Sequence, residues 1–297
     1  MISDHASWLN KLAIGTVQFG LDYGISNKTG QVPADMVTKI LGYAASVGVI
    51  TLDTAVAYGA SEVAIGKTLQ TVAVNFDVIS KFPPETTPES LGRTLEQSLT
   101  RLGTKPLKAY LAHDFASFKN GALREQLTRA KEAGLIEKLG VSVYAPEELE
   151  WLLERDIAFD ITQFPFSIFD QRFKPLFPEL KKRGTELHTR SSFLQGLFFM
   201  EPQSLPEYFW PVKDSIIDLQ RLSQDQGVPL AALLLNYCVM QTDIDKVVFG
   251  VQTLSEFKQN LAAFTYLETC RGLRAELESF ALVNEDVLHP SKWPSSE

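Results

Sequence analysis

Four side chains that can transfer or hold a proton stand at or just after the ends of short apolar runs. Asp53 ends the apolar run at residues 49–52, and Tyr58 follows it by five residues. Lys81 and His113 lie near the ends of the next two such runs. Each residue alone has an ordinary structural explanation, but four ionisable groups at three consecutive run ends are hard to explain by packing. They are therefore candidates for catalytic groups.

These groups suit acid–base chemistry on a carbonyl group. The ordinary pKa of a tyrosine is about 10, and a nearby ammonium group lowers it by favouring the phenolate. Lys81 could lower the pKa of Tyr58 in this way, and Asp53 could hold and orient Lys81. His113 could donate a hydrogen bond to a polarised carbonyl oxygen, beside the general acid. This machinery suits carbonyl reduction, for which a cofactor must bring the hydride.

The elements that must position these groups alternate between strand-like runs and helical patterns such as residues 88–103 and 146–156. Strands separated by helices pair in parallel, and eight such units in under 300 residues predict an α/β fold, a (β/α)8 TIM barrel, as a single domain over residues 1–297. The strand-like runs are 12–17, 49–54, 77–82, 107–113, 138–143, 159–164, 186–192 and 246–251.

In such a barrel the active site gathers at the C-terminal ends of the strands, so the four candidate groups are expected to converge there. Two segments are predicted as additions to the barrel. Residues 193–212, rich in aromatic residues and proline, are expected to form a long loop after strand seven, and residues 271–297 a C-terminal tail with one helix. Several predicted helices are closed by glycine, as a C′ position prefers: Gly103, Gly134 and Gly184.

Composition and charge exclude several classes of protein. The net charge is −8 with no basic cluster, which makes nucleic acid an unfavourable partner. No apolar run approaches the roughly 20 residues that cross a membrane, and the N-terminus does not have the pattern of a secretory signal. The two cysteines, Cys238 and Cys270, form no disulfide framework and no metal-binding spacing. We therefore expect a cytoplasmic protein without a metal site; the sequence carries no signal for an oligomeric state.

The segments "LDTAVAYGASEVAIGKTL", "ISKF" and "YLAHD" closely resemble the aldo-keto reductase superfamily. Its pattern is Asp-x4-Tyr-Gly-x-Ser-Glu, with Lys and His at the next two strand ends. The resemblance extends from "IGTVQFG" to "FKQNLAAF" and implies a barrel with NADP(H) or NAD(H) across its C-terminal face. It also implies that Tyr58 is the proton donor, that Lys81 and Asp53 tune it, and that His113 orients a small carbonyl or sugar substrate.

The resemblance assigns further contacts to the cofactor. Ser142 and Gln163 match residues that bind the nicotinamide carboxamide, and Arg190 stands where an aromatic residue usually stacks on the nicotinamide. The remaining positions implied for the cofactor, from the nicotinamide to the adenosine end, are Gly15, Thr16, Ser191, Phe193, Gln195, Gly196, Leu197, Gly250, Gln252, Thr253, Glu256, Gln259 and Asn260.

The segment "GTVQFGLDYGISNKTGQ" is similar to openings of bacterial members that act in sugar metabolism. Gln18 and Tyr23, with Asn27, could line the mouth of the pocket with polar groups suited to a polyol, or could form an ordinary polar loop. Three phenylalanines could form an apolar wall of the pocket or simply pack under the helices: Phe164, Phe166 and Phe169.

Three positions depart from the family pattern. Val143 replaces a common asparagine and cannot hydrogen-bond the carboxamide, Arg190 replaces an aromatic ring, and Glu256 stands where many members carry an arginine for the 2′-phosphate. These departures leave open a shifted nicotinamide pose, or a nucleotide-binding regulatory barrel with little turnover. A third reading is a Schiff-base aldolase that uses Lys81, which Asp53 disfavours because a carboxylate keeps the amine charged.

Overall fold

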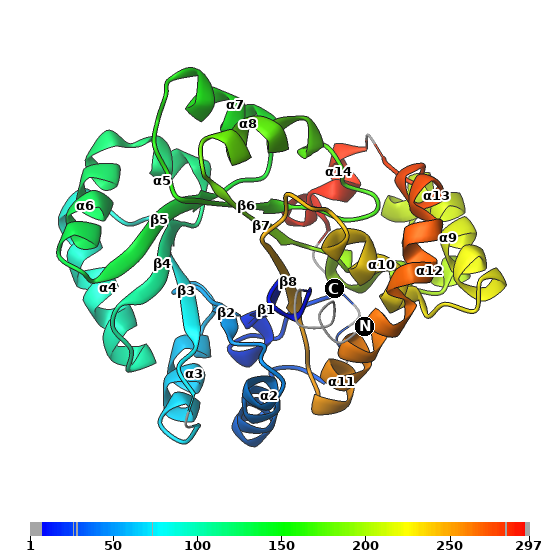
Figure 1. Ribbon diagram of the computed structural model, residues 1–297, viewed down its shortest axis with the longest axis horizontal. Coiled ribbons are helices and arrows are strands. Elements are labelled where there is room, and N and C mark those ends of the chain that lie inside the picture. Colours follow the sequence, from blue (N-terminus) through cyan, green and yellow to red (C-terminus); the bar gives the residue numbers. More distant parts are fainter. Residues whose placement is uncertain (1–7, 26, 28, 73, 283, 295–297) are drawn as a thin grey trace.

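The computed structural model describes residues 8–25, 27, 29–72, 74–282 and 284–294. Eight parallel strands form a closed barrel in sequence order, and β8 pairs with β1 to close it (Figure 1). The predicted (β/α)8 barrel is confirmed, and every predicted strand lies within two or three residues of an observed one. The strands are β1 Leu12–Gly15, β2 Thr51–Asp53, β3 Asp77–Phe82, β4 Leu107–Ala112, β5 Ile136–Ser142, β6 Ile161–Pro165, β7 Glu186–Arg190 and β8 Lys246–Gly250.

Helices surround the barrel as an outer ring (Figure 1). Gly103 ends α4 with φ 64°, as predicted, and at the other end Pro88 opens the helix while the Thr87 side chain caps it by accepting from the Ser90 amide. The helices are α2 Ala34–Ser46, α3 Ser61–Leu69, α4 Pro88–Leu102, α5 Phe115–Lys119, α6 Gly121–Glu132, α7 Pro146–Glu154, α8 Phe177–Lys182, α9 Lys213–Asp225, α10 Leu230–Val239, α11 Leu254–Ala262, α12 Leu267–Gly272, α13 Arg274–Glu278 and α14 Glu285–Leu288.

The segment after β7 is the predicted long connection, and it is built from three short 3-10 turns, Leu194–Phe199, Pro202–Ser204 and Glu207–Val212. The C-terminal segment docks against it. The Tyr208 hydroxyl donates to the carbonyl oxygen of Asp286 at 2.9 Å, and the rings of Phe209 and Trp293 meet edge to face. Among the described residues after Gly272, the tail carries two α-helices, α13 and α14, and the 3-10 turn Pro290–Lys292 rather than the one helix predicted, and it packs onto the barrel.

The barrel interior is divided into layers. Side chains that face inward from β3, β4 and β6 form a small apolar cluster of Ile79, Ala109, Leu111 and Ile161. Two residues further along β3 and β6, on the same face, stand Lys81 and Gln163. The apolar layer thus forms a dry floor, and the C-terminal ends of the strands carry polar groups above it. Within the described part of the chain, we find no helix with both the length and the apolarity needed to span a membrane.

Candidate active site

A buried ion pair lies at the C-terminal end of the barrel. The Lys81 ammonium nitrogen lies 2.7 Å from Asp53 Oδ1 and also donates to the carbonyl oxygen of Thr54 at 3.0 Å. The second carboxylate oxygen, Oδ2, accepts from Gln163 Nε2 at 2.7 Å. Lys81 is fully buried and Asp53 is 3% exposed. Because buried charges are stable only when they are paired and hydrogen-bonded, these contacts explain how both charges persist here.

Tyr58 and His113 face each other beside this pair. Their ring centroids are 5.6 Å apart in an edge-to-face arrangement, and Lys81 Nζ lies 5.4 Å from the centroid of the Tyr58 ring. Both rings are only partly exposed. The four groups predicted from three strand ends therefore converge at one place in the structure.

The loop that carries Tyr58 is fixed by close packing. A side chain on Gly20 would place its Cβ 1.8 Å from the carbonyl oxygen of Tyr58 and 2.4 Å from the amide nitrogen of Ser61, so only glycine fits. Ser61 bonds Thr16, and Glu62 accepts from both Ser80 and Arg101 at 2.6 and 2.7 Å. The Ser-Glu part of the sequence motif thus anchors the start of α3.

The electrostatic surroundings set the proton on each group. The pKa of Tyr58 is raised above its ordinary value, first by removal of water and then by the charge of Asp53, while Arg190 opposes the rise. The predicted lowering of the Tyr58 pKa is therefore wrong in direction, because burial, which disfavours the phenolate, is the largest influence on this side chain. Tyr58 therefore keeps its proton at neutral pH, which is the form that a proton donor needs.

His113 is held neutral. Burial, with help from the charges of Lys81 and Arg190, lowers its pKa to about 3. The neutral imidazole carries one N–H donor, which is what polarising a carbonyl oxygen requires. Burial also lowers the pKa of Lys81, against the opposing pull of Asp53.

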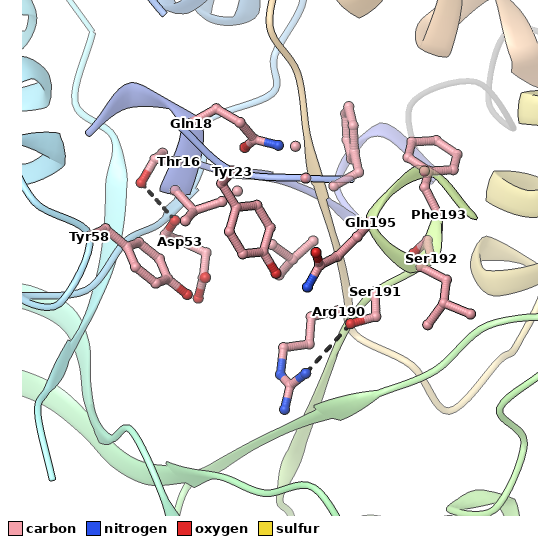
Figure 2. Close-up of a pocket in the computed structure, with 18 of the residues that line it drawn as sticks. Thr16, Gln18, Tyr23, Asp53, Tyr58, Arg190, Ser191, Ser192, Phe193 and Gln195 are labelled. Atoms are coloured by element: carbon pink, nitrogen blue, oxygen red, sulfur yellow. Dashed lines mark hydrogen bonds between the residues drawn. The ribbon is translucent and has the colours of Figure 1, made fainter. Parts of the chain in front are cut away.

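A cavity of about 310 Å³ opens above these groups (Figure 2). Most residues predicted for the cofactor or substrate line it, and Gln252 and Glu256 lie at its edge. Those predicted residues that line the cavity are Gly15, Thr16, Gln18, Tyr23, Asp53, Tyr58, His113, Ser142, Gln163, Arg190, Ser191, Phe193, Gln195, Gly196, Gly250, Gln252 and Glu256. Lys81 is not among the lining residues, but it pairs with Asp53, which is one of them.

Gln259 and Asn260 belong to a second cavity of about 550 Å³, which shares Phe193, Phe199 and Glu256 with the first. The two cavities are therefore neighbours, and together they offer an elongated site. Asn260 is 4% exposed, and its side-chain nitrogen has no hydrogen-bond partner among the described residues.

Several residues predicted for the cofactor or the pocket do not line the first cavity and make contacts within the fold. Leu197 is fully buried and lines neither cavity, and the Thr253 hydroxyl accepts from the Glu256 amide at the start of α11. The Asn27 side chain forms hydrogen bonds with Asp22, Thr29 and Gly30, and it is not a lining group. The three phenylalanines are buried away from the cavity, as packing residues: Phe164, Phe166 and Phe169.

Unsatisfied polar atoms inside the first cavity fit a nicotinamide dinucleotide. Gln163 Oε1 and Gln18 Oε1 are buried and have no hydrogen-bond partner in the described part of the chain. Ser191, Leu194 and Gln195 have positive φ values of 66°, 43° and 53°, which non-glycine residues rarely adopt. Such strain is common where a loop clamps a ligand, so the turn after β7 is a candidate for that role.

Eight residues that line the first cavity were missed by the sequence analysis: Val17, Gly24, Tyr144, Ser192, Leu194, Phe199, Val248 and Phe249. Ser192 and Phe199 lie in the segment already suspected, whereas Tyr144 follows β5 directly. Tyr144 stacks between Arg190, whose Cζ lies 4.0 Å from its ring centroid, and His289, whose ring centroid lies 4.4 Å away. The position of Tyr144, two residues after Ser142 and therefore close to the end of β5, was a signal in the sequence that it could line the cavity. Its contact with His289 could not be foreseen, because the two residues are far apart in the sequence.

The barrel, the acid–base groups at its mouth and the polar cavity beside them define an oxidoreductase site. The Aldo/keto reductase family model matches residues 11–269, so the protein belongs to the aldo-keto reductase family and is an NAD(P)-dependent oxidoreductase. It is 23% identical to the L-galactose dehydrogenase of Arabidopsis thaliana over 312 residues, which cover 96% of this chain and 94% of the relative.

Solved structures show the same fold. An aldo-keto reductase from Bacillus halodurans in its holo form matches with a TM-score of 0.72 and 21% identity, covering 92% of this chain and 94% of that one. An aldo-keto reductase from Pseudomonas aeruginosa, described as putative, matches with a TM-score of 0.67 and 19% identity, covering 88% and 90%. The protein therefore catalyses NAD(P)H-dependent carbonyl oxidoreduction on a small molecule.

Proposed function

We propose that the protein interconverts a carbonyl and an alcohol with Tyr58 as the proton donor to the substrate oxygen in the direction of reduction. One observation carries this proposal: the facing pair of Tyr58 and His113 opens onto the cavity directly above the buried Asp53–Lys81 pair. Protonated Tyr58 and neutral His113 are the two forms that reduction needs.

Each group has a separate task in this scheme. When bound, the cofactor supplies the hydride to the carbonyl carbon. Tyr58 gives its proton to the oxygen, and the phenolate that forms is stabilised by the nearby Lys81 ammonium, whose position Asp53 fixes. His113 donates its N–H to the same oxygen and orients the substrate.

The cavities offer groups to hold the cofactor along its length. Gln163 Oε1 and Ser142 would meet the carboxamide, the turn at residues 191–196 the pyrophosphate, and Gln259 with Asn260 the adenosine. Val143 is fully buried and has no polar side-chain atom. The hydrogen bonds to the carboxamide would therefore come from Ser142 and Gln163.

We propose a polyhydroxylated aldehyde or sugar as substrate. Gln18 and Tyr23 line the cavity and offer polar atoms, and the similarity to an L-galactose dehydrogenase supports a sugar. The test is steady-state consumption of NADPH and of NADH with a panel of aldehydes and aldoses. Saturable turnover of sugar aldehydes is expected. Binding of cofactor without turnover of any aldehyde would support the regulatory barrel instead.

The Schiff-base alternative finds little support in the geometry. Lys81 is fully buried, pairs with Asp53 and is absent from the residues that line the cavity. A carbonyl carbon in the cavity therefore has no path to its nitrogen. Borohydride trapping with a sugar is expected to leave the protein mass unchanged, and a covalent adduct on Lys81 would contradict the proposal.

We predict weak discrimination against NADH. A 2′-phosphate adds roughly −1.5 to −2 charge, by analogy with other phosphate monoesters, and needs a cation or several donors. Glu256 lies at the edge of both cavities, and its Oε2 accepts from the Gln252 amide. Lys258 turns away, with its nitrogen 4.8 Å from the ring centroid of Tyr43. A carboxylate here repels a phosphate and suits a free ribose hydroxyl.

Calorimetric titration of wild type and Glu256→Arg with both reduced cofactors checks this prediction. The arginine is expected to tighten NADPH binding by roughly 10-fold or more through a charge-assisted hydrogen bond, with little change for NADH. Tight NADPH binding by wild type that the arginine does not improve would show that the phosphate is held elsewhere.

A further inference from the structure

Arg190 gives the active-site cavity a cation without an acidic partner among the described residues. It ends β7 and lines the cavity. The two lining acids are engaged elsewhere: Asp53 by Lys81 and Gln163, and Glu256 by the Gln252 amide. The positive charge of Arg190 is therefore not cancelled inside the cavity.

The guanidinium group is held in a fixed pose. Its Nη2 donates to the carbonyl oxygen of Val143 at 3.0 Å, and its plane lies over the Tyr144 ring, which His289 supports from another side. Among the described residues, Nη1 makes only a long contact of 3.5 Å with the Ser191 hydroxyl. Because arginine carries five N–H donors, at least three remain for a ligand in the cavity.

This cation stands close to the reacting groups. Its charge helps to lower the pKa of His113 and opposes the rise in the pKa of Tyr58. Figure 2 shows Arg190, Tyr58, Tyr23 and Gln195 around one open space. Arg190 ends β7, and its side chain extends past β6 to Val143, the residue after β5. It therefore points away from β1 and β8, which carry Gly15 and Gly250.

We propose that Arg190 binds an anionic oxygen group of the substrate, so that the preferred substrates are carbonyl compounds that carry a carboxylate or a phosphate. A guanidinium fork matches the geometry of either group, and a neutral polyol would leave the cation uncompensated. This inference rests on the proposed function only in placing the carbonyl substrate in this cavity.

Matched pairs of substrates test the proposal: terephthalaldehydic acid and its methyl ester, glucuronate and glucuronamide, and a hexose phosphate and the free hexose. Arg190→Gln is expected to lower kcat/KM for the acidic member by roughly 10- to 100-fold, mainly through KM, and for the neutral member by less than about 3-fold. Arg190→Lys should recover part of the loss, because it keeps the charge without the fork. Arg129→Gln, the same change on the exposed surface of α6, is the control and should alter neither member.

Binding measurements separate the possible sources of the anion. Titration with reduced cofactor is expected to give the same Kd for wild type and Arg190→Gln. If the variant instead binds the cofactor more weakly, by a factor that matches its loss of turnover, Arg190 serves the cofactor and the proposal is wrong. Equal losses for acidic and neutral substrates would also overturn the proposal. If wild type turns over no aldehyde, the proposed function fails by itself. In that case calorimetry decides the present inference: wild type should bind the acid more tightly than its ester, and Arg190→Gln should lose this preference.

Discussion

Replacing Tyr58 with phenylalanine is expected to lower kcat for carbonyl reduction by roughly 10²–10⁴-fold, the usual contribution of a positioned general acid. The change removes only the hydroxyl, and the ring keeps its edge-to-face contact with His113. Cofactor affinity should therefore stay near the wild-type value. Single-turnover reduction of a good aldehyde, with cofactor titration alongside, measures both quantities.

Two results would count against this role. Retention of about half the wild-type rate constant or more would reject Tyr58 as the proton donor, since a general acid contributes far more than this. A large loss of cofactor affinity in the same variant would place the hydroxyl in binding instead. His113→Gln, which keeps a hydrogen-bond donor in place, is a useful companion and should be impaired less than Tyr58→Phe.

Lys81→Met is expected to lower both the free energy of unfolding and the turnover rate. It leaves the Asp53 carboxylate buried without its cation, and breaking a buried pair in this way costs about 3–5 kcal/mol of the free energy of unfolding. It also removes the charge that stabilises a phenolate on Tyr58, so turnover should fall severely. Asp53→Asn should be impaired less, because Asp53 acts through Lys81. Urea unfolding and kcat/KM measure the two effects.

A double variant separates folding from catalysis. Asp53→Asn combined with Lys81→Met removes both charges and should recover most of the lost stability while turnover stays low. Recovery of turnover along with stability would show that the ion pair is only structural. A Lys81→Met enzyme that shows the same dependence of alcohol oxidation on pH as wild type would contradict a charge effect on Tyr58.

The fold and the acid–base centre were open to prediction because local patterns specify them. The strand at 77–82 was placed with its observed bounds, since a short apolar run between polar turns has few alternatives. Asp53, Lys81 and His113 follow from the rule that barrel strands end at one face. Gly103, Gly134 and Gly184 all adopt the positive φ expected after a helix.

What could not be predicted depends on contacts between distant residues. Glu62 anchors the start of α3 by accepting a hydrogen bond from Arg101, which lies on another helix. The stack of Arg190, Tyr144 and His289 brings together the end of β7, the end of β5 and the C-terminal tail. The direction of the Tyr58 pKa shift depends first on how deeply the phenol is buried and then on the charge of Asp53, and only the folded geometry reveals the burial. The burial of Leu197 could not be foreseen, because sequence position alone does not say which side of a 3-10 turn faces the cavity.

The most direct test of the central claim is to follow the hydride. Reduced cofactor carrying deuterium at nicotinamide C4, on the transferable side, is given to the enzyme with a sugar aldehyde, and the alcohol product is examined by mass spectrometry and NMR. We predict deuterium on the former carbonyl carbon in every product molecule, with the same labelled position but far slower formation by Tyr58→Phe. Product without deuterium at that carbon, or formation that does not depend on Tyr58, would contradict carbonyl reduction at this site.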